Sequence, residues 1–505
     1  MKKWAGIFCG LTVFAVLAVG VVYAQPPDPK PIDFPYIGNR TAVWIAAQLH
    51  ILFAAFILGA PIFAVTCEWL GKRKGDLRYD RLAREVIKVT AILYSMTALT
   101  GGLFVMIALA LYPHFFSWLT SLFFPIFAIA YPLLFIAETI VLYFYVYTWD
   151  SLSGDKKGRH IAIGVLLNII GTVTLFAIDG PTSFMNTPPD VPEGLDMDRR
   201  IFVDTAASVW QLMYNHSWMP LNLHRLIGNI TFGGFITGLI AAYMYMFAKT
   251  EKEKAHYDWM GYIGNLIGVG ALLFLPLFGY ILAAEFFDFD ASIGPYMMAD
   301  QLSMFFEMQG AMVGLIFLGS NYYIWLSMKR ITGAERFTTV VKVGFAIVLV
   351  GNAIWMTPHG FAATQFMATE ETELPSEWGF LALMPAKNTA ALLIVLVTIV
   401  NYILYNRAIR TGTIQWGKID FTSQFVLIFL ALSVIWTMGL MGTVRSLVRK
   451  YFHVYLILPD FTEESFTPTL AYSSILITIL TLVFFAVVTL AIWLSLKVGG
   501  EAKAK

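Results

Sequence analysis

The sequence predicts an all-α protein, a polytopic bundle of about eleven transmembrane helices with a signal peptide or anchor helix before them. The first observation is composition: 58% of the 505 residues are apolar and only 13% are charged, against about 25% charged residues in soluble domains. The second is a mean hydropathy of +0.69. The third is the recurrence of apolar runs near the length of about 20 residues that crosses a bilayer core. Together they exclude a soluble enzyme, a disordered protein and a secreted disulfide scaffold.

The charge balance and the cysteines exclude further classes. The net charge is +1, from 34 basic and 33 acidic residues, so no basic surplus is available for binding nucleic acid. The two cysteines, Cys9 and Cys67, lie within apolar runs. They form no disulfide framework, zinc motif or Cys-x-x-Cys-His attachment for c-type haem. Any haem in this protein must therefore be held non-covalently.

The first apolar run, residues 4–24, is of a different kind from the others. It follows Lys2 and Lys3 and ends in Val-Tyr-Ala before Gln25 and two prolines. Small residues in this frame are typical of a signal-peptide cleavage site. A retained anchor helix is the alternative, and we expect residues 1–24 to be one of the two.

Eleven further runs are long and apolar enough to cross a membrane. They lie at roughly 42–69, 88–113, 121–148, 161–183, 224–248, 260–284, 306–328, 338–360, 388–406, 422–443 and 469–496. The longest loops, 184–223, 361–387 and 444–468, are rich in proline, aspartate and glutamate. We therefore expect a membrane bundle in a lipid bilayer, with no separate soluble domain.

Basic residues predict the orientation of the bundle. Twenty-two Lys and Arg lie in the loops near 70–88, 155, 250, 330 and 410 and in the C-terminal tail, whereas the opposite loops carry nine. Cytoplasmic loops carry the excess of Lys and Arg. The first set of loops and the C-terminus should therefore face the cytoplasm.

Four side chains in the predicted spans are potential metal ligands. His50 lies about eight residues into the first span, His224 opens the fifth, Met308 opens the seventh and His359 closes the eighth. With the predicted orientation, all four fall in the outer half of the membrane. Imidazole and thioether groups are the usual axial ligands of b-type haem, so this common depth indicates a haem layer. The alternatives are hydrogen-bonded helix contacts for the histidines and apolar packing for the methionine.

Two carboxyl groups also need an explanation. Glu138 lies about 11 residues from the inner end of the third span, or about 16 Å deep at 1.5 Å per residue. An ionisable group at that depth is a functional candidate. We expect it to be protonated or connected to a water chain; a neutral carboxyl bonded to a neighbouring helix is the alternative. Glu68, near the inner end of the first span, fits either a proton path or an interfacial cap.

Several short motifs surround these residues and follow one another in a definite order and spacing. They are His50 followed by Leu58-Gly59 and Glu68, Glu138 eleven residues before Trp149-Asp150-Ser151-Leu152, Phe184-Met185-Asn186-Thr187-Pro188, Asn215 nine residues before His224, and Phe305-Phe306-Glu307-Met308. In this order they resemble motifs of subunit I of cytochrome bd-type quinol oxidases. The resemblance covers about residues 42–405.

The sequence also departs from that family. The family's second buried Glu falls near Ala130 here, and its long quinol-binding loop is reduced to about 286–302. A polar stretch in the second span is replaced by apolar residues at 104–109. Where the family has the Glu that ligates a third haem, this sequence has Pro358-His359-Gly360, with His359 one position away from the place of that Glu. Two spans, 422–443 and 469–496, have no counterpart. The chain therefore resembles a divergent member.

The resemblance implies a haem-containing oxidoreductase subunit of the bacterial cytoplasmic membrane that passes electrons from quinol to oxygen. His224 and Met308 would hold a low-spin haem b, and His50 an oxygen-accessible haem. His359 would replace the family's Glu on a third haem, the second and third haems being of b or d type. Protons would enter past Glu138, with Glu68 as a further candidate. The implied partner is a second membrane subunit.

Two other functions stay open from the sequence. A quinol-linked subunit could feed a c-type cytochrome without reducing oxygen, as the missing second Glu and short quinol loop favour. The second is a transporter or a structural membrane subunit without haem; transport is disfavoured because the spans show no buried Asp, Lys or Arg pairs and no broken-helix symmetry. We predict three regions: 1–24, a haem-binding membrane domain at 25–408, and two additional spans at 409–505.

Overall fold

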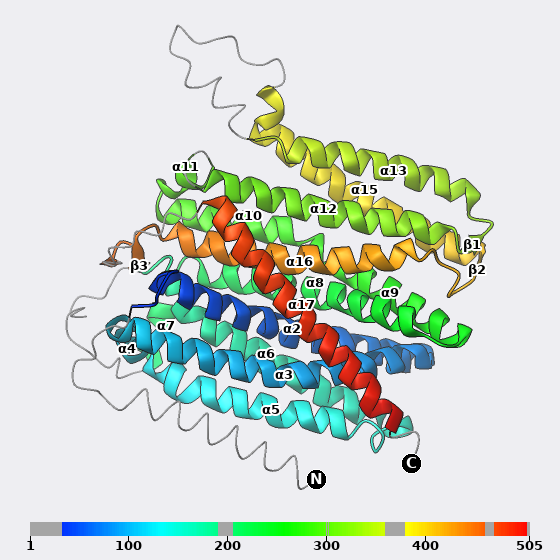
Figure 1. The fold of residues 1–505 in the computed structure, drawn as a ribbon, viewed down its shortest axis with the longest axis horizontal. Helices are drawn as coiled ribbons and strands as arrows, with labels where there is room; N and C mark the ends of the chain where they lie inside the picture. Colours follow the sequence, from blue (N-terminus) through cyan, green and yellow to red (C-terminus); the bar gives the residue numbers. More distant parts are fainter. Residues whose placement is uncertain are drawn as a thin grey trace.

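The structure is a computed structural model that describes residues 33–189, 206–298, 300, 302–358, 379–459 and 469–501. Long helices lie side by side, and the last one, α17, crosses the others obliquely (Figure 1). Within the described residues, eleven helical segments are long and apolar enough to cross a membrane. The predicted all-α, multi-pass fold is confirmed. The run at 4–24 lies outside the described residues.

The spanning segments are longer than their apolar centres. They are α2 (Asn39–Lys74), α3 (Leu77–Leu111), η1 (Pro125–Ala130) with α5 (Tyr131–Tyr147), η2 (Gly154–Lys156) with α6 (Lys157–Phe184), α8 (Trp218–Phe247), α9 (Glu251–Leu272) with α10 (Leu275–Phe289), α12 (Ser303–Met328), α13 (Glu335–Trp355), α15 (Met384–Thr411), α16 (Thr422–Val448) and α17 (Leu470–Glu501). The shorter elements are α4 (Pro113–Leu122), α7 (Ala206–Met213), α11 (Ile293–Met298), η3 (Gly379–Ala382) and the antiparallel strand pairs β1 (Ile331–Thr332) with β2 (Thr413–Ile414) and β3 (Phe452–Val454) with β4 (Leu458–Pro459).

The two ends of the bundle differ. One carries α4, α7, α11 and β3, and the other carries β1 and β2 (Figure 1). The last turn of α2, with three consecutive basic residues, lies at the second end. We call this the inner end and the opposite one the outer end, following the orientation that the basic residues predict.

Local sequence explains the turn between α2 and α3 at the inner end. Gly75 has a φ of 66° and ends α2 in the left-handed conformation, which favours glycine. Asp76 accepts a hydrogen bond from the backbone N–H of Arg78 and caps α3. The Arg78 side chain also bonds this carboxyl and holds the pKa of Asp76 below its ordinary value.

Glycines bring the central helices into close contact. A Cβ on Gly59 of α2 would lie 1.9 Å from the carbonyl oxygen of Asn229 in α8, and one on Gly233 would lie 2.9 Å from the backbone of Gly59. Helices in membranes commonly pack through such small residues. The two helices that carry His50 and His224 are therefore fixed against each other.

The C-terminal helices belong to the same bundle. Helix α16 packs against α2, α8 and α12, and α17 packs against α2, α3 and α16. The pair α13 and α15 instead packs on α12 at one edge (Figure 1). The proposed haem-binding helices and the C-terminal spans thus share one packed core.

Two segments differ in detail from the sequence-based expectation. The sixth span is two helices that break at Leu273 and Phe274, because Pro276 has no N–H with which to continue the first helix. The expected loop at 444–468 begins as the last turn of α16, to Val448, and then forms the β3–β4 hairpin. This hairpin lies at the outer end.

Candidate functional site

A cavity of about 800 Å³ opens among α2, α3, α4, η1, α5, α6, α8, α16 and β3. Most of its wall is apolar, and six phenylalanines contribute to it: Phe104, Phe115, Phe116, Phe127, Phe135 and Phe452. Cavities of this size commonly bind small molecules and cofactors. The polar groups on its wall therefore decide what it can hold.

His50 lines this cavity from α2. It lies eleven residues after the start of the helix, or about 16 Å along it. Its Nδ1 is 3.1 Å from the carbonyl oxygen of Thr97 in α3. A carbonyl oxygen only accepts, so Nδ1 carries the hydrogen and Nε2 is left with a lone pair. Histidines that bind metals are oriented in this way, with the second nitrogen donating to a backbone carbonyl.

The wall beside the imidazole is kept free of side-chain atoms. A Cβ on Gly101 of α3 would lie 2.9 Å from Cε1 of His50. Glycine is thus needed here so that the ring can keep its hydrogen bond to Thr97. The sequence analysis did not single out this residue.

Four arginines line the same cavity: Arg40 from α2, Arg225 from α8, and Arg445 and Arg449 from α16. Each holds a polar partner. Arg225 pairs with the buried carboxylate of Asp179, and Arg445 donates to the carbonyl of Thr182 at 3.3 Å. Guanidinium groups bind carboxylates through paired hydrogen bonds. The cavity therefore combines an imidazole, an apolar wall and a basic region.

The β3–β4 hairpin contributes to the wall of the cavity. The ring of His453 lies parallel to that of Phe115, with centroids 4.5 Å apart, and both line the cavity. Tyr455 bonds the carbonyl of Met185 through its N–H and donates its hydroxyl to Asp290 at 2.6 Å. That hydrogen bond lowers the pKa of the Asp290 carboxyl.

Glu138 lines the same cavity from α5 and is buried, with 7% of its surface exposed. Its Oε1 would lie 3.2 Å from a Cβ on Gly171 of α6. The structure thus brings together two residues that the sequence identified separately, His50 and Glu138. A carboxyl group at this place can hold or release a proton at the cavity wall.

His224 and Met308 lie on α8 and α12, and both helices pack against α16. They are half-buried, and each is within the first two turns of its helix at the outer end. In the described part of the chain, Nδ1 of His224 is buried and has no hydrogen-bond partner. Neither residue is among those that line the cavity around His50. A ligand between them would form a second site.

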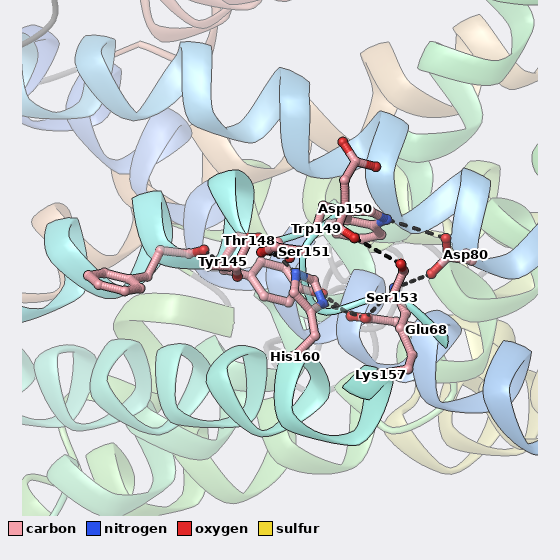
Figure 2. A network of polar contacts seen from close by, with 11 residues as sticks. Glu68, Asp80, Tyr145, Thr148, Trp149, Asp150, Ser151, Ser153, Lys157 and His160 are labelled. Carbon is pink, nitrogen blue, oxygen red and sulfur yellow. Dashed lines mark hydrogen bonds and ion pairs between the residues drawn. The ribbon is translucent and has the colours of Figure 1, made fainter. Parts of the chain in front are cut away.

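Glu68 lies elsewhere, at the inner end of α2, in a polar network (Figure 2). It is fully buried. It accepts a hydrogen bond from the Tyr145 hydroxyl at 2.6 Å and forms an ion pair with Lys157 at 2.7 Å. Its Oε1 lies 2.5 Å from Nδ1 of His160. Because α2 continues to Lys74, Glu68 does not cap the helix end.

Sequence reasoning found part of this arrangement. His359, the expected ligand of a third haem, lies outside the described residues. Sequence reasoning missed His160, Lys157 and the arginines of α16. A signal for Arg445 was available, since it is among the few basic residues on the side that the orientation predicts to be outer.

One comparison with known proteins, the match to a protein family, agrees with the resemblance. The sequence matches the family described as cytochrome bd terminal oxidase subunit I over residues 39–292. No curated protein matches. Among solved structures, the chain is similar to the bd oxidase from Geobacillus thermodenitrificans at 15% identity and a TM-score of 0.49, with 91% of this chain and 96% of that chain covered.

The family match covers half of the chain. It includes four of the site residues that the sequence predicted, His50, Glu68, Glu138 and His224. The fold is the all-α, multi-pass bundle that the composition and the apolar runs predicted. The chain therefore belongs to the cytochrome bd terminal oxidase subunit I family and is a membrane oxidoreductase subunit of the bd type.

Proposed function

We propose that this chain is the haem-bearing subunit of a quinol oxidase, which oxidises quinol near the outer face and reduces oxygen to water. One observation carries the proposal: His50, whose Nδ1 is bonded to Thr97 and whose Nε2 keeps a free lone pair, lines a large apolar cavity together with arginines and Glu138. This combination fits a non-covalent haem.

Each part of the cavity has a task in this proposal. His50 would ligate the iron, and the apolar wall would hold the macrocycle. Arg225, Arg445 and the other guanidinium groups would bind the two propionates. A haem bound there supplies one-electron transfer and an open coordination position for oxygen.

His224 and Met308 would hold a low-spin haem b in a second site. The unpartnered Nδ1 of His224, buried within the described part of the chain, supports a bound group beside this ring. Two fixed ligands keep the coordination constant on electron transfer. A third haem, of b or d type like the one at His50, would be ligated by His359.

Glu138 would deliver protons to the cavity. Oxygen reduction consumes protons, and a buried carboxyl group on the wall of the oxygen site can supply them one at a time. It lines the cavity from α5, a helix that runs on to the inner end of the bundle, and this position fits uptake from the cytoplasm. The haems would then lie toward the periplasmic side of the bacterial cytoplasmic membrane.

The expected partner is a second membrane subunit, and quinol is the expected electron donor. Large apolar side chains remain exposed along several helices, including Leu392, Leu396 and Ile403 of α15. In a bilayer such faces contact lipid or another membrane protein. The c-type cytochrome considered from the sequence as an alternative acceptor gains no support from the family.

The test is a reduced-minus-oxidised spectrum of the purified complex, followed by oxygen uptake with a reduced quinol. We expect b-type haem bands and oxygen consumption. His50→Ala should abolish carbon monoxide binding and leave the low-spin band in place. Haem reduction by quinol without oxygen uptake would instead indicate the electron-transfer alternative, and a complex without haem would refute both.

A further inference from the structure

The inner network around Glu68 has a hydrogen-bond pattern that requires a proton between two side chains. Nε2 of His160 is 2.8 Å from the carbonyl oxygen of Tyr145, which can only accept, so Nε2 carries a hydrogen. The other ring nitrogen, Nδ1, is 2.5 Å from a carboxylate oxygen of Glu68. One proton must lie between these two atoms, either on the imidazolium or on the carboxylic acid.

We propose that Glu68 and His160 form a proton-loading site at the inner entrance of the path to Glu138, with Asn168 as the connecting residue. This inference rests on the proposed oxygen reduction, which consumes the protons. It adds a site outside the cavity and a residue, Asn168, that sequence reasoning had left aside.

The site has a connection to water on the inner side. Glu68 and His160 are fully buried, whereas 12% of the Lys157 side chain and 29% of the Asp80 side chain are exposed. Lys157 forms ion pairs with both carboxylates, Glu68 and Asp80. Figure 2 shows these residues in one continuous network. Exposure thus rises stepwise from the buried pair to the inner surface.

The titratable groups that face Glu68 come from three helices. Tyr145 lies on α5, His160 and Lys157 lie on α6, and Asp80 of α3 is reached through Lys157. Together they satisfy both carboxylate oxygens. A carboxylate without these partners would be strongly destabilised at this burial.

Helix α6 connects this site to Glu138. A Cβ on Gly164 would lie 2.8 Å from the Tyr145 ring, and one on Gly171 would lie 3.2 Å from Glu138. Asn168 lies between these glycines, about 6 Å from the first along the helix and about 4.5 Å from the second. Its Nδ2 donates to the carbonyl oxygen of Pro61 at 3.5 Å.

The amide oxygen of Asn168 supports a role in this path. Within the described residues, this Oδ1 is buried and has no hydrogen-bond partner. Buried polar atoms are almost always bonded to protein or water. An unpartnered acceptor between Tyr145 and Glu138 is therefore suited to hold a water molecule that relays protons.

The transfer is balanced at each step. The shared proton leaves the Glu68–His160 pair, crosses water held at Asn168 and protonates the Glu138 carboxylate, which becomes neutral. The pair is left with neutral His160 and ionised Glu68, so that a lone pair faces a carboxylate oxygen. This repulsion favours reloading by a proton from inner water near Asp80. After Glu138 gives its proton to oxygen reduction, the chain regains its starting charge.

The test uses the complete complex, with Glu68→Gln and Asn168→Leu variants. Glu85→Gln is the matched control. Like Glu68, Glu85 pairs with a histidine and a basic side chain at the inner side, here His256 and Arg81, and it does not line the cavity. The low-spin spectrum and the anaerobic reduction of the haems by quinol report folding and electron entry. Oxygen uptake and the rate of proton uptake in a single turnover, followed with a pH dye, report the relay.

We expect both variants to keep the parent spectrum and haem reduction, and to slow oxygen uptake and proton uptake by about a hundredfold, the lower range for a positioned proton-transfer group. The control should match the parent. An active parent with both variants at its rate overturns the relay and leaves the oxidase function intact. A parent that reduces no oxygen overturns both. If Glu68→Gln fails to bind haem, Asn168→Leu decides, because it removes no ion pair.

Discussion

Gly101→Ala tests whether the orientation of His50 determines haem binding. The change adds one methyl group to α3 and removes no polar atom. The new Cβ would lie 2.9 Å from Cε1 of His50 and 3.2 Å from its Nδ1. Non-bonded carbon atoms prefer separations of about 3.5–4.0 Å. The imidazole must therefore move by roughly 0.6–1 Å away from Gly101.

That movement acts directly on the hydrogen bond that orients the ring. The bond from Nδ1 to the Thr97 carbonyl is 3.1 Å long, close to the upper limit of about 3.2 Å for N–H···O bonds. A further half ångström breaks it. Loss of such an orienting partner typically lowers metal affinity by about 10–100-fold. Overpacking itself costs about 1–3 kcal/mol of stability.

The assay compares haem content and the carbon monoxide difference spectrum of the purified complex. We expect Gly101→Ala to lose most of the carbon monoxide signal while the low-spin band keeps its height. Gly270→Ala is the control, because a Cβ on Gly270 would meet no atom within 4 Å. A Gly101→Ala complex with the parent's carbon monoxide spectrum would refute the assignment of His50 as the oxygen-site ligand.

Three further predictions concern other parts of the molecule. Met308→Leu should turn the second haem high-spin and remove its sharp reduced alpha band, whereas Met304→Leu, an exposed position on the same helix, should leave the spectrum unchanged. Gly59→Ala should prevent assembly of a haem-containing complex, as measured by haem content after purification, because its Cβ would lie 1.9 Å from a carbonyl oxygen of α8. The hydrogen bond from Tyr455 lowers the pKa of Asp290 in the folded protein. The stability that this bond adds to the hairpin is therefore complete above about pH 4, the ordinary pKa of a carboxyl group, and is lost as the pH falls through the lower pKa of the folded state. Amide hydrogen exchange of the β3–β4 hairpin should therefore become faster in acid in the parent. Tyr455→Phe should show fast exchange already at neutral pH, because it lacks the about 1–2 kcal/mol of stability that the hydrogen bond contributes.

The spans could be predicted from the sequence because the bilayer imposes a local rule. A segment that crosses lipid must satisfy its backbone within itself and present an apolar surface, so length and composition suffice to find it. The breaks within spans are less visible. The sixth span reads as one apolar run, and only Pro276 marks the restart of the helix.

The candidate site depends on lateral packing, which the sequence does not encode locally. Depth alone placed His50 and His224 in the outer half, but it could not assign Glu138 to the cavity of His50. The arginines of α16 line the same cavity as His50, although they are almost 400 residues from it along the chain. The expectation of no buried ion pairs is wrong, since Arg225 pairs with Asp179 and Arg330 with Asp258.

The pair of Arg330 and Asp258 shows why buried charge alone does not identify a proton path. Both side chains are fully buried, and Arg330 also donates to Tyr405 and lies over the ring of Trp416. Arginine keeps its proton at any physiological pH. This network can therefore hold α9, α15 and the segments around Arg330 and Trp416 together, but it cannot relay protons. The network of Glu68 differs because its partner is an imidazole, whose ring nitrogens can take up and release a proton. The chemistry of the partner, rather than burial, is what makes Glu68 the candidate for proton transfer.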